Sequence, residues 1–276
     1  MQKLFDKTKV YLFAPTHTGK IMSQMMGYVI TDGNTVIVID GGTLAESDRL
    51  YELIKSLGGR VDLWILTHAH QDHIGALTGI LENKKEIQIE KLIYDFPPRD
   101  EVIERLDHPL RVEVANRFFD VIKTVDIPHF IPTVGERLSI GIYGIEFYKR
   151  GNVFFSNNFN DTSLVFRLNT ETMPILFPAD LGPAGWERLK AEMTDLSVLK
   201  CPICQMAHHG QNGCPKDFYQ FVSPEYVMWN STTWLYNNDL GEGFNTAPYA
   251  SVETRGWIEE LGAKSFTAFE ETLIIE

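Results

Sequence analysis

One stretch of the sequence places four metal-ligating side chains within six positions: Leu66-Thr67-His68-Ala69-His70-Gln71-Asp72-His73-Ile74-Gly75. It closes an apolar run that begins at Leu63 and predicts a buried strand. Ile74, Leu77 and Leu81 then recur at helical spacing. The stretch therefore predicts a turn between a strand and a helix, where functional groups gather on open α/β sheets.

The order of residues in this turn suits two cations. In extended backbone, His68 and His70 point to the same side and can share one cation. Asp72 and His73 lie where the chain enters the helix and can reach a second cation beside the first. Imidazole and carboxylate ligands suit zinc, iron or manganese rather than calcium. The alternative is a histidine-rich polar loop, because isolated motifs give false positives.

Three further landmarks follow in order along the chain. Asp40 ends the apolar run 36–39, Asp180 ends the segment 175–180, and residues 207–210 are Ala-His-His-Gly. Together with the histidine motif, they resemble the metallo-β-lactamase superfamily over residues 25–215. The resemblance implies an α/β fold, a four-layer αββα sandwich, and a metal-dependent hydrolase.

The resemblance also implies roles for individual residues. In the family, the residues matching His68 and His70 hold a first metal. Those matching Asp72, His73 and a late histidine hold a second, and the aspartate matching Asp180 bridges both. The implied cofactor is one or two Zn²⁺ ions, with Mn²⁺ or Fe as alternatives. Bridged cations lower the pKa of a shared water from 15.7 towards about 7, which supplies hydroxide for hydrolysis.

Two assignments stay open. In an extended strand His208 and His209 point to opposite sides, so we expect one of them to bind metal. The resemblance favours His208 as the ligand. His209 is then expected, with Asp72, to be catalytic, through substrate contact or proton transfer, or else to be a packed histidine. Asp40 either accepts a hydrogen bond from a ligand histidine or is a turn aspartate before Gly41-Gly42.

The chain departs from the family at one position. Many members complete the first metal with a further histidine, but no histidine lies between His129 and His208. An Asn-rich turn followed by Ser-Leu-Val, residues 157–165, stands there instead. Asn160 or Asp161 in this turn is a candidate substitute ligand or substrate contact. The turn resembles a subgroup that includes the hydrolase domain of bacterial DNA-uptake channel proteins, and it argues against a true β-lactamase or a glyoxalase-type thioesterase.

Composition limits the kinds of binding partner and the compartment that we expect for the protein. The formal net charge of −12 argues against nucleic acid, because phosphate contacts need clustered Lys and Arg, and favours a small-molecule substrate. The N-terminal residues show no signal peptide, and no apolar run is long enough to cross a membrane, so we expect a cytoplasmic protein. Three cysteines fit a reducing compartment, and Cys201-Pro-Ile-Cys204 is expected to contribute buried thiols. The sequence does not indicate an oligomeric state.

Strands and helices alternate twice without a Pro/Ser-rich linker, which predicts a single domain over residues 1–276. We expect a capping box at Thr43, a strand over 198–206 and a terminal hairpin. Residues 229–249 carry aromatic side chains without periodicity. They form either a wall or lid of a pocket, or a loop that buries its aromatics in the core.

The leading functional hypothesis is a hydrolase that uses a metal-activated water on a small phosphodiester or phosphorylated substrate. One alternative is hydrolysis of a lactone, thioester or β-lactam. Another is a non-catalytic descendant that binds only metal or ligand; the intact Asp72, His73 and Asp180 argue against it, and the missing histidine keeps it open. A third is di-iron reduction of oxygen or nitric oxide, but family members of that type carry glutamate where His70 stands.

Overall fold

The computed structural model describes residues 3–16, 24–152 and 158–276. Two seven-stranded sheets form its centre. In spatial order, the first sheet contains β16 (Leu273–Ile275), β1 (Lys9–Leu12), β2 (Gly27–Thr31), β3 (Val36–Asp40), β5 (Leu63–Ile65), β7 (Leu92–Ile93) and β8 (His129–Phe130). The second contains β15 (Lys264–Thr267), β14 (Tyr226–Trp229), β13 (Ile203–Gln205), β12 (Ile175–Phe177), β11 (Val165–Asn169), β10 (Tyr143–Lys149) and β9 (Arg137–Ile140). Two short strands, β4 (Arg60–Val61) and β6 (Gln88–Ile89), pair apart from both sheets.

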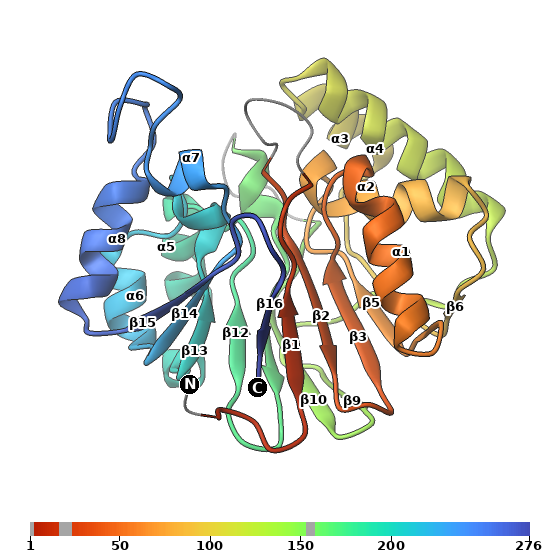
Figure 1. Cartoon of the computed structure of the whole chain (residues 1–276), viewed down its shortest axis with the longest axis horizontal. Coiled ribbons are helices and arrows are strands. Elements are labelled where there is room, and N and C mark those ends of the chain that lie inside the picture. Colours follow the sequence, from red (N-terminus) through yellow and green to blue (C-terminus); the bar gives the residue numbers. More distant parts are fainter. Residues whose placement is uncertain (1–2, 17–23, 153–157) are drawn as a thin grey trace.

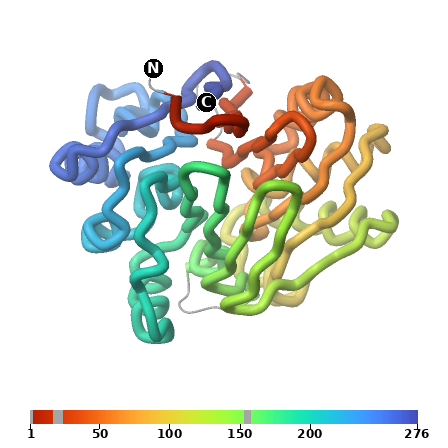
Figure 2. The backbone as a smooth tube through the Cα atoms, turned by 90° about the horizontal axis from the view of Figure 1, so that it is seen from below, coloured from red at the N-terminus to blue at the C-terminus, as the bar shows by residue number. Residues whose placement is uncertain are grey.

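Helices cover the outer face of each sheet (Figure 1). Those on the first sheet are α1 (Ser47–Ser56), α2 (Gln71–Glu82), α3 (Arg99–Arg105) and α4 (Pro109–Val121). Those on the second are α5 (Pro183–Glu192), α6 (Lys216–Val222), α7 (Thr233–Tyr236) and α8 (Ser251–Glu260). Figure 2 shows the same division from below, with the orange and yellow helices on one side and the blue ones on the other. The predicted αββα sandwich is confirmed.

Alternation along the strands explains the layers. In β3, Ile37 and Ile39 point to the core between the two sheets, whereas Val36 and Val38 point to the core beneath α1 and α2. A strand with both faces covered must be apolar on both, and all five residues of β3 are buried. The second sheet repeats this arrangement, because Leu176 of β12 packs with Trp186 of α5 in a third core.

Several local predictions are confirmed. Thr43 forms the capping box with Glu46 at the 3₁₀ helix η1 (Leu44–Glu46), which leads into α1. The three cysteines are buried free thiols.

In the part of the chain that the structure describes, no helix is long and apolar enough to span a membrane.

Two predictions need correction. The strand expected over 198–206 is shorter: β13 covers only Ile203–Gln205, and the 3₁₀ helix η4 (Leu196–Leu199) takes the start of the expected range. The last two strands do not form a hairpin. β15 pairs with β14 in the second sheet, and β16 crosses to pair with β1 in the first. The C-terminal segment therefore joins both sheets.

Strand direction brings the predicted site residues together. β3 runs parallel to β5, and β12 runs parallel to β13. The segments that carry Asp40, the histidine motif, Asp180 and the His-His pair all leave the carboxyl ends of these four strands. They meet at one end of the sandwich, where the two sheets face each other.

Candidate metal centre

Asp40 orients the histidine motif from the end of β3. Its carboxylate accepts hydrogen bonds from the backbone N–H of Thr67 (2.8 Å) and the Thr67 hydroxyl (2.9 Å). His73 Nδ1 lies 2.8 Å from the same carboxylate. Because Nδ1 donates to Asp40, the His73 Nε2 lone pair is left for another partner. Asp40 is fully buried, and Trp64 holds its backbone through an indole N–H bond of 2.7 Å to the carbonyl.

His68 and His70 lie on the turn between β5 and α2, with their rings on the same side. Nε2 of His68 is 3.0 Å from Nδ1 of His70. His70 is the extended residue just before α2, so its ring turns back toward His68. Burial first, and the positive charge of Arg111 second, lower the pKa of His70 to about 3. Its imidazole is therefore neutral, as a metal ligand must be.

Asp180 lies at the centre of the histidines. One oxygen, Oδ2, lies 3.3–3.8 Å from Nε2 of four imidazoles, those of His73, His68, His209 and His208. The turn that carries Asp180 is fixed by buried hydrogen bonds. Gln205 Oε1 accepts from the backbone N–H of Ala179 (2.8 Å), and the Ser163 hydroxyl accepts from that of Asp180 (3.1 Å).

Two groups of buried side chains have ligand atoms close enough to share an ion. Ligand atoms of His68, His73 and Asp180 all lie within 4.8 Å of one another, and so do those of Asp72, His73 and His209. In the second group, His209 Nε2 is 3.2 Å from the Asp72 carboxylate. Nδ1 of His209 is 2.9 Å from the Asn230 carbonyl, which orients the ring.

The backbone of the His-His pair differs from the prediction. The pair lies in a 3₁₀ turn, η5 (Ala207–Gly210), and both histidines have left-handed φ angles, 51° and 57°. The expected extended strand with rings on opposite sides is wrong, because both Nε2 atoms lie within 3.8 Å of Asp180 Oδ2. Gly210 continues the turn at φ 80°, and a Cβ there would lie 1.8 Å from the Trp229 ring.

The two histidines have different surroundings. His209 is 1% exposed. The side chain of His208 is 18% exposed and lines the cavity. Nε2 of His208 also lies 3.2 Å from the amide nitrogen of Asn160. The position of His209 is thus the one enclosed by the Asp72 group, and His208 faces the open side.

Asn160 and Asp161, the two candidates for the missing ligand, have different surroundings in the structure. The carboxylate of Asp161 accepts the backbone N–H groups of Gly182 (3.1 Å) and Gly185 (3.2 Å) at the start of α5. Asn160 instead lines the cavity beside His208. Asn157, the first residue of the predicted turn, lies outside the described residues.

The donor set fits a metal ion. Within the described ranges, four buried atoms at this centre have no hydrogen-bond partner: Asp72 Oδ1, His73 Nε2, Asn160 Oδ1 and Asp180 Oδ1. Buried polar atoms are almost always paired, so these four atoms are available to coordinate an ion. Imidazole nitrogens and carboxylate oxygens are ligands for zinc, iron and manganese.

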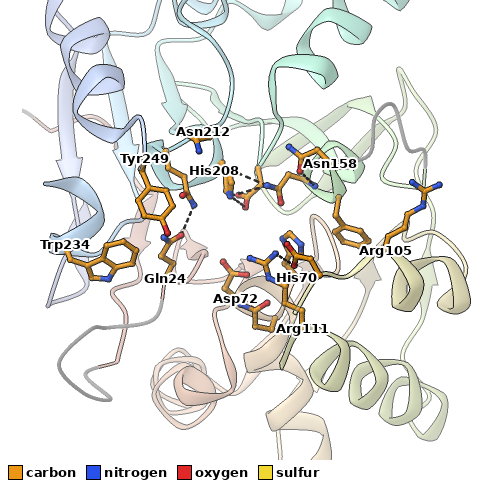
Figure 3. A pocket seen from close by; sticks show the side chains of 16 residues that line it. Gln24, His70, Asp72, Arg105, Arg111, Asn158, His208, Asn212, Trp234 and Tyr249 are labelled. Atoms are coloured by element: carbon orange, nitrogen blue, oxygen red, sulfur yellow. Dashed lines mark hydrogen bonds and ion pairs between the residues drawn. The ribbon is translucent and has the colours of Figure 1, made fainter. Parts of the chain in front are cut away.

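A cavity of about 640 Å³ opens over this centre (Figure 3). Its size is typical of small-molecule sites. Arg105 and Arg111 line one side, and Trp234 and Tyr249 line the other. The two arginines were missed in the sequence, where Arg111 has the spacing of an ordinary ion pair with Asp107, which it forms at 2.7 Å.

The aromatic segment 229–249 divides between its two predicted roles. Trp229 is fully buried in the core beneath α6 and α8. Trp234 and Tyr249 form the cavity wall, with ring centroids 5.8 Å apart. Phe244 belongs to neither group and is 60% exposed.

Fold and centre together define a class. The family model of the metallo-beta-lactamase superfamily matches residues 26–185, more than half of the chain. The chain belongs to this superfamily, whose fold is that of metal-dependent hydrolases, and it carries candidate His/Asp metal sites.

Solved structures support the fold. The metallo-beta-lactamase fold protein YhfI from Bacillus subtilis aligns over 98% of this chain and 100% of its own, at 12% identity and a TM-score of 0.58. Igni18, a metallo hydrolase from Ignicoccus hospitalis, aligns over 98% of both chains, at 12% identity and a TM-score of 0.54. The β-hydroxylase CmlA aligns over 98% of this chain and 54% of its own, at 10% identity and a TM-score of 0.54. The sequence matches no curated protein. Since a hydroxylase shares the fold, the reaction must be argued from the site.

Proposed function

We propose that this protein is a metal-dependent hydrolase of a small phosphodiester or phosphorylated substrate. One observation carries the proposal: Asp180 Oδ2 lies among four imidazoles, beside buried ligand atoms that have no other partner in the described part of the chain. A carboxylate between two groups of ligands is suited to bridging two cations. We propose Zn²⁺, with Mn²⁺ or Fe as alternatives.

The geometry suggests how the ligands divide. His68 Nε2 and His70 Nδ1, together with Asp180, would hold the first cation. Asp72, His73 and His209 would hold the second. Asp40 acts through His73, because it accepts the Nδ1 proton and leaves Nε2 as the ligand atom.

This division reverses the roles that the resemblance suggested for the His-His pair. His209 is buried against Asp72 and would hold the metal, whereas His208 faces the cavity. His208 is thus the histidine positioned to contact substrate and to exchange a proton with it. Asn160 would be the remaining candidate for a further ligand of the first cation, because Asp161 caps α5.

A bound divalent cation supplies a water of lowered pKa and polarises the oxygen under attack, and a pair of cations stabilises both the attacking and the leaving oxygen. The protein's part is to orient the ligands and, at His68 and His70, to keep the imidazoles neutral. Burial keeps the pKa of His68 well below its usual value, and the Asp40 bond sets the tautomer of His73.

Three features support the substrate class. Paired cations suit phosphoryl chemistry. The cavity of about 640 Å³ suits a small molecule. The net charge of −12 disfavours long nucleic acid, whose binding depends on many basic side chains.

The test combines metal content with a substrate panel. Protein purified without added metal is analysed by mass spectrometry for bound metals. It is then assayed with Zn²⁺ or Mn²⁺ on bis-nitrophenyl phosphate, a phosphorylcholine ester, single-stranded DNA, nitrocefin and a lactone. We expect bound transition metal and turnover of a small phosphodiester, both lost in the double variant Asp72→Ala, His73→Ala. Fast nitrocefin or lactone cleavage without phosphodiester turnover would contradict the substrate class.

A further inference from the structure

A positive side chain projects into the cavity beside the candidate metal ligands. Arg111 lies in the first turn of α4 and lines the cavity together with His70 and Asp72 (Figure 3). Its side chain is 32% exposed, and its Nη1 donates to the Asp107 carboxylate at 2.7 Å. Arg105, at the end of α3, lies farther out along the same wall.

The charges of the lining favour an anion at this wall. Its carboxylates, among the described residues, belong to Asp72, Asp107 and Asp180. Asp72 and Asp180 are taken by the candidate metal centre. This leaves two guanidinium groups against one carboxylate, a net charge of +1, in a chain whose net charge is −12. Bound cations would make the cavity more positive still.

The ion pair with Asp107 does not explain why Arg111 lines the cavity. Arg117, on the same helix, makes the ordinary structural contacts: its guanidinium pairs with Glu82 at 2.6 Å and with Glu113 at 3.4 Å. The Arg117 side chain is 38% exposed, close to the value for Arg111, but it does not line the cavity. Exposed pairs of this kind contribute little to stability. A guanidinium carries five N–H donors, so Arg111 can bind a second oxyanion while it keeps Asp107.

We propose that Arg111 binds the phosphoryl group of the substrate and that Arg105 adds positive charge at the rim. This inference rests on the proposed function, because it concerns the substrate of the same site. It makes Arg111 a specificity-determining residue: a substrate without a negative charge next to the bond that is cleaved would lose this contact. The aromatic pair on the opposite wall, Trp234 and Tyr249, is left for the organic part of the substrate.

The test measures binding of inorganic phosphate to the metal-loaded protein by titration calorimetry. We expect Arg111→Gln to weaken phosphate binding by about 10-fold or more, with Arg111→Lys in between, because charge-assisted hydrogen bonds are among the strong ones. Asp107→Asn should tighten binding, since it removes a competing carboxylate. Arg117→Gln is the matched control and should bind phosphate like the unmodified protein. Metal content should be unchanged in all four variants.

The outcomes separate this inference from the proposed function. Equal phosphate binding by Arg111→Gln and the unmodified protein would overturn the role of Arg111, and so would an equal loss in Arg117→Gln. Phosphate binding that depends on Arg111, without turnover of any substrate in the panel, would leave the inference standing and refute the hydrolase. If the protein hydrolyses a phosphodiester, Arg111→Gln should raise the KM for that anionic substrate. The KM for a neutral ester should be unchanged.

Discussion

Asp40→Asn tests whether the centre depends on the tautomer of His73. The carboxylate of Asp40 accepts three hydrogen bonds: Oδ1 accepts from the Thr67 N–H, and Oδ2 accepts from the Thr67 hydroxyl and faces His73 Nδ1. The substitution keeps the shape of the side chain and replaces one acceptor oxygen with an NH₂ donor. Because the site is fully buried, no water is available to compensate.

Either orientation of the new amide carries a cost. If its nitrogen takes the Oδ1 position, it meets the Thr67 N–H donor to donor, and a buried donor without a partner costs about 1–3 kcal/mol. If its nitrogen takes the Oδ2 position, His73 can accept the bond only by moving its proton from Nδ1 to Nε2. The Nε2 atom is the one that faces Asp180 at 3.3 Å, and a protonated Nε2 cannot bind metal.

We therefore expect Asp40→Asn to weaken binding of the second cation by about 10 to 100-fold, the usual effect of losing a group that orients a metal ligand. This range corresponds to about 1.4–2.7 kcal/mol. Competition with a chromophoric chelator measures the affinity, and urea unfolding of the metal-free protein measures the separate cost of folding. Asp62→Asn is the control, because Asp62 also accepts a backbone N–H, that of Val36 at 2.9 Å, but belongs to neither metal group. Unchanged metal affinity in Asp40→Asn would refute the reasoning.

Three further predictions follow from single contacts. His209→Ala should remove one of the two bound metal equivalents, whereas His208→Ala should retain both and lose mainly turnover. The reverse result in a metal titration would make His208 the metal ligand, as the sequence resemblance suggested. Gly210→Ala should destabilise the fold by about 1–3 kcal/mol, because the new Cβ would overlap Trp229 at φ 80°. Gly256→Ala in α8, where a Cβ meets open space, should instead stabilise by about 0.5–1 kcal/mol; equal urea midpoints for the two would contradict this. Burial raises the pKa of Glu171, but hydrogen bonds from Thr8 and Lys7 outweigh it and hold the value at about 2, below the ordinary 4.5. The stabilisation from ionised Glu171 is thus present above pH 4.5 and lost as the pH falls towards 2. Glu171→Gln should therefore reduce the dependence of the free energy of unfolding on pH between 4.5 and 2. An unchanged pH dependence in this range would argue against the prediction.

The layers of the sandwich and the His68–His70 part of the metal centre could be predicted because the sequence signals for them are local. Residues 36–39 are an unbroken apolar run, and a strand that is apolar on both sides must be covered on both faces, as β3 is in the structure. His68 and His70 are two residues apart, and this spacing was enough to predict rings on the same side, although the structure has a bend at residues 68–69 rather than extended backbone. Periodicity does not reveal the partner of a strand. For that reason β15 and β16, which are close in the sequence, were expected to pair although they join different sheets.

The arrangement of His208 and His209 in the metal centre depends on packing that no local sequence pattern shows. The left-handed conformation of His208 and His209 is held by contacts from other elements. Gly210 packs under Trp229, and the Asn230 carbonyl lies 2.9 Å from the His209 ring. Propensity disfavours two consecutive non-glycine residues in that region, so tertiary structure had to override it. Arg111 was missed for a similar reason: its spacing from Asp107 is that of a common surface pair.

The position of the centre predicts that metal binding and folding are coupled. Asp72 and His73 lie at the start of α2 on the first sheet, whereas Asp180 and His209 follow strands of the second. A cation held by both sets therefore joins the two sheets, in addition to direct contacts such as the 2.9 Å bond from the Leu164 N–H to the Thr67 carbonyl. A ligand that binds only the folded state stabilises it by about 2.7 kcal/mol at a hundred times its Kd. Removal of metal by a chelator should lower the urea midpoint of the unmodified protein, and the double variant Asp72→Ala, His73→Ala should be insensitive to the chelator. A midpoint that is equal with and without metal in the unmodified protein would mean that the sheets dock without help from the centre.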